Sequence, residues 1–326
     1  MTSLMRWWMP LALSLAAFSG TLPAFAQSRF PDHPIRFVVP FPPGGGNDIL
    51  ARAIAPKMGE FLGQPVVIDN KAGAGGNIGT DLVAKSPPDG YTIVIASNQI
   101  TINPWLYSKL PFDIERDFTP VAQAASVPMV LVVHPSVAAN NLREFIALVK
   151  AQPDKFNHST PGDGTPQHIA FEVFNHAAGI KVTHVPYKGT GPAIADLLAG
   201  QVQAAIGTMA SLEQHVKAGK LRALGVTTPK RSQTLPQVPT LAEAGLPGFE
   251  VPLWYSILAP ANTPKEVVNR LSSDIAKSLA TPEIRDRLTG QGFEVNYLNA
   301  EQMNDLIKRD MLRWQKSIRD IGLKMD

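Results

Sequence analysis

Hydrophobic and polar positions along the chain follow two patterns that alternate. Short β-branched runs such as "IRFVV" and "YTIVIAS" are typical of buried strands. Between such runs, apolar residues recur at helical spacing, as across residues 48–62 and 142–151. Strands that alternate with helices predict parallel sheets with helices on both faces, which is an α/β fold. Pro56 lies inside the first predicted helix and predicts a kink or an early end there.

The alternating pattern is interrupted at two places, which predicts two lobes. Strand-like sequence breaks at Pro128, and a proline-rich stretch fills residues 229–252. The strand "LWYSILAP" then returns, and it is followed by helices predicted at residues 265–280, 283–290 and 300–321. We expect residues 27–124 to begin the first lobe, residues 125–226 to form the second, and residues 227–326 to return to the first.

The first 26 residues have the pattern of a secretory signal rather than of the fold. Arg6 precedes an apolar run, and "AFA" ends at Ala26, which is typical of a small-x-small cleavage site. Pro10, Gly20 and Pro23 interrupt the run, so it is too short for a membrane anchor. We therefore expect export and cleavage near Ala26.

Composition narrows the class of protein. The chain has 326 residues, of which 44% are hydrophobic and 17% charged, as in globular proteins. Its formal net charge is only +3 and no basic run occurs, which argues against a nucleic-acid partner. The sequence contains no cysteine, so disulfides, thiolate metal sites and a cysteine nucleophile are excluded.

Four loops share a composition that suits anion binding: "PFPPGGGND", "NKAGAGGNIG", "STPGDGTPQH" and "PYKGTGP". Each combines glycine with a hydrogen-bonding residue and ends where a helix is predicted to begin. Glycine lets backbone N–H groups approach a ligand, and a helix N-terminus adds free donors and partial positive charge. In open α/β sheets the ligand site lies at such loops. The loops therefore indicate a carboxylate or another small anion, although tight turns without a ligand remain the alternative.

Motifs for catalysis or cofactor binding are absent from the sequence. It has no GxxxxGK[ST] loop, no GxSxG elbow and no HExxH pair. His158, His168, His176 and His184 are too far apart to share one helix turn. His168 follows a predicted Thr165 cap, where it can orient the loop or touch a ligand. We expect no catalytic residue, no metal and no cofactor, and hence no enzyme.

Five segments in this order carry a family resemblance across nearly the whole mature chain: "PIRFVVPFPPGGGNDILAR", "GQPVVIDNKAGAGGNIGTDLVAKSPPDGYT", "HVPYKGTGPAIADLLAGQV", "GKLRALGVTTPKRSQTLPQVPTLAEAGLPGFE" and "APANTPKEVVNRL". The chain resembles the Bug family of periplasmic solute receptors, which serve tripartite tricarboxylate transporters. The resemblance implies a type II periplasmic binding protein, located in the periplasm, that closes two lobes on a small carboxylate. It also implies membrane transporter subunits as partners and a monomeric receptor.

Several points stay open at this level. The ligand could be a dicarboxylate, a tricarboxylate, an acidic amino acid or an aromatic carboxylate. The fold could also serve a secreted enzyme or a ligand-sensing accessory protein that is not coupled to transport. Gln203 stands where many relatives carry Asp, and it either senses the ligand or lies on a strand edge. Phe41 and Trp254 are candidate apolar walls.

The resemblance also implies the positions of the ligand-binding residues. Lys188 belongs with Tyr187 to the segment that matches the family's "PYKG" motif. The ligand-binding residues implied in the first lobe are Phe41, Pro43, Gly44, Gly45, Gly46, Asp48, Gly75, Gly76, Asn77, Ser97 and Asn98. From the second lobe they are Thr160, Gly162, Gly164, Thr165, His168 and Tyr187.

Overall fold

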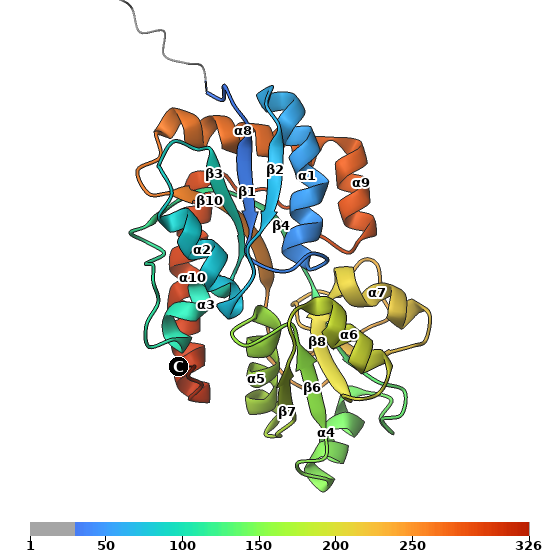
Figure 1. Cartoon of the computed structure of the whole chain (residues 1–326). Coiled ribbons are helices and arrows are strands. Elements are labelled where there is room, and N and C mark those ends of the chain that lie inside the picture. Colours follow the sequence, from blue (N-terminus) through green and yellow to red (C-terminus); the bar gives the residue numbers. More distant parts are fainter. Residues whose placement is uncertain (1–29, 326) are drawn as a thin grey trace, which may run out of the picture.

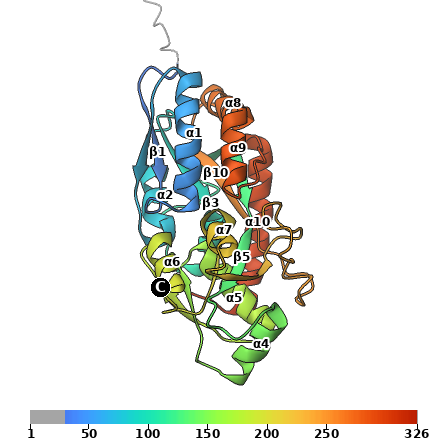
Figure 2. The same ribbon diagram turned by 90° about the vertical axis from the view of Figure 1, so that its right-hand side faces the viewer.

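The computed structural model describes residues 30–325, which form two α/β bodies arranged one above the other (Figure 1). The predicted signal and its cleavage site lie outside the described residues. We use "first lobe" for the sheet that contains β1 and for its helices, and "second lobe" for the other sheet and its helices. Figure 2 shows that together they give the molecule an elongated outline.

The first lobe is built on a five-stranded sheet with the order β2-β1-β3-β10-β4. Its strands are β1 (Ile35–Val39), β2 (Val66–Asn70), β3 (Thr92–Ser97), β4 (Phe118–Val127) and β10 (Leu253–Pro260). Its helices are α1 (Gly46–Leu62), α2 (Asn77–Ala84), α3 (Gln99–Leu106), α8 (Lys265–Ala280), α9 (Pro282–Gly290) and α10 (Ala300–Ile321), and a 3₁₀ turn, η1 (Ala74–Gly76), precedes α2.

The second lobe has a five-stranded sheet with the order β7-β6-β8-β5-β9. Its strands are β5 (Met129–Val133), β6 (Asn157–Thr160), β7 (Thr183–Pro186), β8 (Ala204–Thr208) and β9 (Arg222–Val226). Its helices are α4 (Leu142–Ala151), α5 (Pro166–Ala178), α6 (Thr190–Leu198) and α7 (Met209–Lys217).

Each sheet is mixed rather than purely parallel, which refines the predicted α/β fold. β1 runs parallel to both β2 and β3, but β10 pairs antiparallel with β3 and with β4. In the second sheet β5 pairs antiparallel with β8 and with β9. These antiparallel strands, β5 and β10, are those that follow a passage of the chain from one sheet to the other.

The chain passes between the sheets at Pro128 and again through residues 227–252. Proline has no N–H for the sheet ladder, so β4 ends at Val127 and β5 begins at Met129 in the other sheet. The predicted boundary at residues 124–125 falls within β4. The strands therefore break at Pro128, and the chain crosses between the two sheets there and through residues 227–252.

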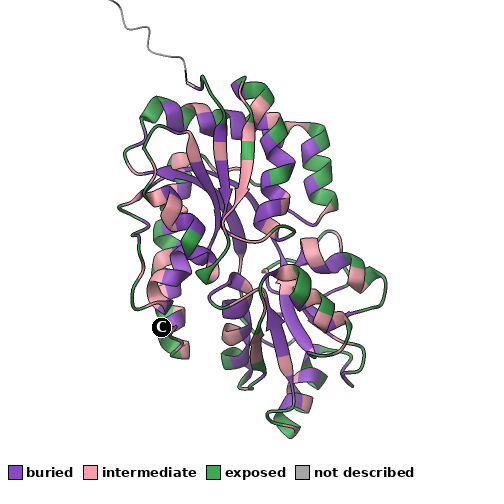
Figure 3. Ribbon diagram, viewed as in Figure 1, coloured by how far each residue is buried: buried purple, intermediate pink, exposed green. Residues whose placement is uncertain are grey.

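The inner strands of both sheets are buried between helices, whereas the edge strands β2 and β7 are partly exposed (Figure 3). Ile35, Phe37 and Val39 on β1 are fully buried and pack with Leu50 and Ile54 of α1. Helix α1 continues through Pro56 to Leu62, which is the end predicted from the sequence, so Pro56 does not shorten the helix. No helix within residues 30–325 is long and apolar enough to cross a membrane.

Candidate ligand-binding cleft

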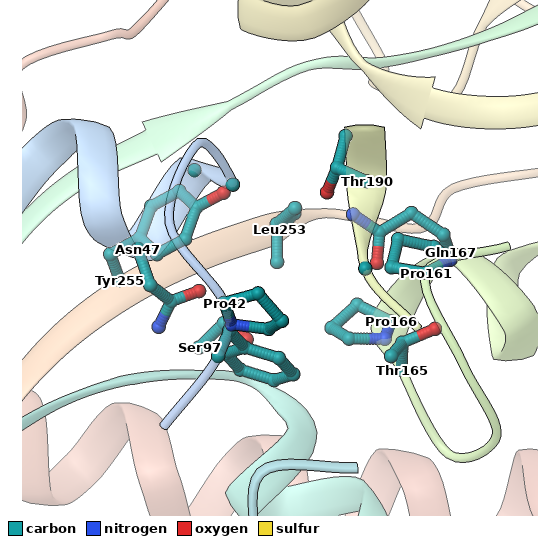
Figure 4. Close-up of a pocket in the computed structure, with 14 residues that line it drawn as sticks. Pro42, Asn47, Ser97, Pro161, Thr165, Pro166, Gln167, Thr190, Leu253 and Tyr255 are labelled. Carbon is teal, nitrogen blue, oxygen red and sulfur yellow. The ribbon is translucent and has the colours of Figure 1, made fainter. Parts of the chain in front are cut away.

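A pocket lies between the two lobes, where loops from both sheets meet (Figure 4). Figure 4 shows Tyr255, Asn47 and Pro42 on one side of it, with Thr190, Gln167 and Pro166 opposite. We call it the inner pocket. It is lined by Phe41, Pro42, Gly45, Gly46, Asn47, Ser97, Pro161, Thr165, Pro166, Gln167, Gly189, Thr190, Leu253 and Tyr255.

The first lobe contributes the N-terminus of α1 to this pocket. The Ile49 N–H bonds the Gly45 carbonyl and closes the first helical turn. Helix geometry leaves the preceding N–H groups without partners inside the helix, and Gly45 at the N-cap has no side chain to accept from them. These donors and the positive end of the helix dipole are available to an anion.

Tyr255 is fixed against this helix start. A Cβ atom added to Gly46 would overlap the Tyr255 hydroxyl, so only glycine allows the ring to come this close to the backbone. Tyr255 is almost fully buried, and burial raises the pKa of its phenol. The neutral hydroxyl is therefore a hydrogen-bond donor at the end of the pocket.

Asp48 braces the first loop and does not line the pocket. Its carboxylate accepts hydrogen bonds from Arg52 Nε at 2.9 Å, from Asn70 Nδ2 at 3.0 Å and from the Gly44 N–H at 3.0 Å. Burial tends to raise the pKa of Asp48, but these hydrogen bonds outweigh it and hold the pKa below its usual value. The carboxylate stays ionised and its oxygens are occupied by the loop.

The second lobe contributes the starts of α5 and α6. Thr165 caps α5: its hydroxyl accepts from the His168 N–H at 3.4 Å and donates to the Gly162 carbonyl at 2.7 Å. Pro166 follows at the first helical position, where a missing N–H costs nothing. Gly189 precedes α6 and Thr190 begins it, so a second glycine-capped helix faces the pocket.

A stack of histidine rings supports the loop of the second lobe. The His168 and His184 rings are 3.8 Å apart at 10°, and His158 lies 5.1 Å from His184. His168 Nδ1 accepts from the Gly164 N–H at 3.3 Å, and His184 Nε2 lies 2.6 Å from Thr160 Oγ1. Burial, together with the neighbouring histidines, lowers the pKa of His168 to about 3 and that of His184 to about 4. The neutral rings orient the loop.

Asp163, His168 and His184 bring possible metal-ligating atoms within 4.8 Å of one another. Both imidazole rings are already used, since they stack face to face and hydrogen-bond the loop. Coordination of one ion would require each ring to point a lone pair at it, which breaks the stack. The arrangement therefore favours a structural role.

Beyond the inner pocket the cleft widens into a second space, which we call the outer pocket. It is lined by Phe41, Pro42, Ala72, Gly73, Ala74, Gly75, Gly76, Tyr107, Pro161, Gly162, Asp163, Thr165, Tyr187, Lys188, Gly189 and Met325. The loops of the two lobes touch here. A Cβ on Gly75 would lie 2.8 Å from the Asp163 carbonyl oxygen, and one on Gly164 would lie 2.7 Å from the Tyr107 hydroxyl.

The residues expected to bind ligand fall into two groups in the structure. Those that line the inner or the outer pocket are Phe41, Gly45, Gly46, Gly75, Gly76, Ser97, Gly162, Thr165 and Tyr187. Those outside the lining of both pockets are Pro43, Gly44, Asp48, Asn77, Asn98, Thr160, Gly164 and His168. Of the second group, Asn77 bonds Asn103 and Asn98 donates to the Pro252 carbonyl, so both brace the cleft floor.

One expectation from the sequence was wrong, and one open question is narrowed. Trp254 does not form a wall of the cleft: it is buried on the other side of the sheet, where its Nε1 donates to Asp310. Side chains alternate along a strand, so its neighbours Leu253 and Tyr255 face the pocket instead. Of the two alternatives for Gln203, the structure favours the one without ligand contact, because its Oε1 accepts from the Asn157 N–H and it lines neither pocket.

Nine residues of the inner pocket were not among the ligand-binding residues expected from the sequence, although seven of them lie within the four predicted loops. They are Pro42, Asn47, Pro161, Pro166, Gln167, Gly189, Thr190, Leu253 and Tyr255. Asn47, Gln167 and Thr190 each lie in the first helical turn after a glycine-rich loop, which was a usable signal. Tyr255 comes from a strand far along the chain, and only the folded sheet brings it to α1.

Two lobes joined by paired crossings, with a pocket between helix N-termini, define a two-lobed solute-binding protein. The sequence profile described as "Tripartite tricarboxylate transporter family receptor" matches residues 50–323. The chain belongs to the family of tripartite tricarboxylate transporter receptors, and the resemblance to the Bug proteins is confirmed. This is a family of periplasmic receptors rather than of enzymes.

Relatives match over almost their whole length. A protein of the tcbD–tcbE intergenic region of Pseudomonas sp. strain P51 is 42% identical over 307 residues, which is 94% of this chain and 91% of the relative. The solved structure of Rhodopseudomonas palustris Rpa4515 with adipate has a TM-score of 0.87 at 35% identity and covers 90% of this chain and 99% of its own.

Two further solved structures of the family show the same fold. The periplasmic binding protein BugD has a TM-score of 0.86 at 35% identity and covers 91% of this chain and 100% of its own. MatC from Rhodopseudomonas palustris, with bound malate, has a TM-score of 0.82 at 32% identity and covers 89% of this chain and 100% of its own.

Proposed function

We propose that this protein is a periplasmic receptor that captures a small carboxylate between its lobes and delivers it to a tripartite tricarboxylate-type transporter. One observation carries the proposal: N-terminal ends of α1, α5 and α6 converge on the inner pocket, whose described lining contains no Asp, Glu, Lys or Arg. Such a site attracts an anion with backbone donors and helix dipoles. Relatives of the same fold hold adipate and malate.

Binding would couple to lobe closure. The ligand takes donors from α1 in the first lobe and from α5 and α6 in the second, so it stabilises the closed form over the open one. Each lobe is built on one of the two sheets. The chain crosses between the lobes at Pro128 and again through residues 227–252. A ligand enclosed in this way needs one chain only, and we propose a monomer.

Some residues of the cleft would bind the carboxylate directly, and others would hold the loops in place. Gly45, Gly46 and the Tyr255 hydroxyl hold one side of the carboxylate, and Thr190 with Gln167 holds the other. Asp48 and His168 act through the loops that they brace. No chemical step is needed, because capture and release are the whole cycle.

Calorimetry and thermal unfolding of the mature protein, against a panel of carboxylates and amino acids, test the proposal. A ligand present at about 100 times its Kd should add about 2.7 kcal/mol to the free energy of unfolding. The bound compound should be recovered unchanged by mass spectrometry. Turnover of the compound, or stabilisation by cationic or neutral solutes alone, would contradict a carboxylate receptor.

Export and delivery have their own readouts. The mature N-terminus should be Gln27, which intact-mass measurement of periplasmic protein can establish. Deleting the gene should abolish uptake of the ligand found by calorimetry, and an episomal copy should restore it. Normal uptake in the deletion strain would instead favour a sensing role.

A further inference from the structure

The two pockets of the cleft differ greatly in size, and this difference bears on which carboxylate binds. The inner pocket has a volume of about 30 Å³, whereas the outer pocket, which is open to solvent, has a volume of about 730 Å³. A single water needs roughly 10–15 Å³ of such space. The inner pocket therefore fits a carboxylate group and little more, and the rest of a ligand must lie in the outer pocket.

The two pockets join at a neck. Phe41 and Pro42 from the first lobe and Pro161 and Gly189 from the second line both of them. The neck is narrow, because a Cβ on Gly189 would lie 3.2 Å from Pro42 Cγ. A carboxylate can reach the inner pocket on a slim chain while a bulkier body stays outside.

The walls of the outer pocket are largely apolar. The Phe41 ring rests on Gly76, where an added Cβ would lie 3.0 Å from Phe41 Cζ. Tyr187 donates its hydroxyl to Asp196 at 2.7 Å, which fixes its ring at the pocket. Tyr107 and Met325 lie side by side, since the Met325 N–H bonds the Leu106 carbonyl at 2.8 Å and Met325 bridges to Tyr107.

The charged groups of the outer pocket do not favour a second anion. Its lining contains one acid, Asp163, and one base, Lys188. Lys188 is exposed to solvent, where an ion pair contributes little. A second carboxylate would gain little from these two side chains and would leave the aromatic and thioether surfaces uncovered. The glycine-rich loop of residues 73–76, which precedes α2, also lines the outer pocket, so a dicarboxylate is the alternative that an adipate probe tests.

We infer that the ligand is a monocarboxylate with an apolar body of about the size of one aromatic ring. Its carboxylate occupies the inner pocket and its body lies between Phe41, Tyr107, Tyr187 and Met325. This inference rests on the proposed function and names its substrate class. It also makes Met325, next to the C-terminus, a residue that determines specificity.

Calorimetry with three probes tests the inference: 3-phenylpropanoate, propanoate and adipate. We expect 3-phenylpropanoate to bind at least tenfold more tightly than either of the other two, because only its ring fills the outer pocket. Met325→Ala should weaken 3-phenylpropanoate about fivefold through lost apolar contact. Leu312→Ala, a control on the exposed face of α10, should leave its affinity within twofold of the wild-type value.

The opposite results separate this inference from the proposed function. Tighter binding of adipate, weakened by Lys188→Met, would overturn the monocarboxylate inference and leave the carboxylate receptor standing. Equal binding of 3-phenylpropanoate and propanoate would overturn the role of the outer pocket. Failure of every carboxylate in the panel would overturn both.

Discussion

The Tyr255 hydroxyl group limits which residue can occupy position 46, where helix α1 begins. Gly46 and Gly290 are both helical glycines without a positive φ, yet they differ in what a methyl group would meet. At Gly46 it would overlap the Tyr255 hydroxyl, whereas at Gly290 it would meet open space. Alanine substitutions at these two positions can therefore be compared, which separates an effect on the pocket from the general effect of replacing a helical glycine.

Gly46→Ala should lower ligand affinity at least tenfold while the protein stays folded. The methyl group must displace either Tyr255 or the helix start, and such overpacking costs about 1–3 kcal/mol. Calorimetry and circular dichroism measure the two consequences. Gly290→Ala is the matched control and should bind as the wild type does. Wild-type affinity in Gly46→Ala would mean that the α1 start and Tyr255 are not part of the site.

Histidines beneath the second-lobe loop make stability depend on pH. His168 and His184 have pKa values of about 3 and about 4 in the folded protein, below the ordinary value of 6.5. Between about pH 4 and 6.5 the unfolded chain binds these protons and the folded protein does not. Stability is therefore full above about pH 6.5 and falls as the pH decreases toward 4.

His184→Gln should flatten this dependence, because it removes one group that must stay neutral in the fold. Each such histidine contributes up to about 1.4 kcal/mol per pH unit within the window. Urea unfolding at several pH values between 4.5 and 7.5 gives the slope. His176→Gln, at an exposed position on α5, serves as the control and should keep the wild-type slope. An unchanged slope in His184→Gln would contradict a neutral stack.

At the scale of elements, the Asp310 carboxylate joins α10 to α3 and β10 within the first lobe. Asp310 is buried, and its Oδ2 accepts from Thr101 Oγ1 at 2.8 Å and from Trp254 and Trp314 Nε1 at 3.1 Å each. These donors come from α3, β10 and α10. Burial raises the pKa of Asp310, although the hydrogen bonds act in the opposite direction.

Asp310→Leu should destabilise the protein by about 2–4 kcal/mol, since it leaves two buried indole N–H groups without their acceptor and Thr101 with the Asn98 carbonyl alone. Asp310→Asn keeps one acceptor oxygen at the same place and should cost about 1 kcal/mol. Chemical denaturation followed by tryptophan fluorescence reports both, because two of the donors are indoles. Equal losses in the two variants would show that the acceptor oxygen contributes nothing.

Elements with a clear amphipathic pattern could be predicted from the sequence, and others could not. Residues 142–151, 265–280 and 300–321 form helices with the predicted bounds, because each has one apolar stripe and recognisable ends. α3 was missed: most of its residues are buried, so it has no polar face, and Pro104 lies inside it. The antiparallel direction of β5 and β10 is also invisible in their composition, since pairing is a property of the assembled sheet.

The site was predictable only in part, for a related physical reason. Glycine-rich loops before helices can be read from the sequence, and those of Gly45 and Thr165 line the pocket. Which side of β10 faces the cleft depends on the register of the strand, so Trp254 was expected where Leu253 and Tyr255 lie. Side chains that brace a loop, such as Asp48, carry the same sequence signal as side chains that touch a ligand.

At the scale of the whole molecule, Gly45 and Thr190 face each other across the cleft. A Cβ atom on Gly45 would lie 3.4 Å from Thr190 Oγ1, the position that the Sγ atom of a cysteine at residue 190 would occupy, so a disulfide between the two lobes is within reach. The sequence has no cysteine of its own, so an engineered pair has no competing thiol.

The double variant Gly45→Cys, Thr190→Cys should form a disulfide that locks the lobes together. The oxidised protein should neither admit nor release ligand, and a reducing agent should restore exchange to the level of the single variants. Thiol titration and ligand release kinetics measure these effects, with each single variant as a control. Free thiols after oxidation would show that the lobes do not approach this closely in solution.

The position of Met325 has a practical consequence for handling the protein. The last described residue lies in the wall of the outer pocket, beside Tyr107. The described chain begins at the far end of the first lobe, away from the cleft (Figure 1). An affinity tag, fluorophore or surface tether attached to Met325 itself would therefore occupy the outer pocket. Labels and immobilisation points are better placed near residue 30, and affinities from protein labelled close to Met325 should be compared with those of unlabelled protein.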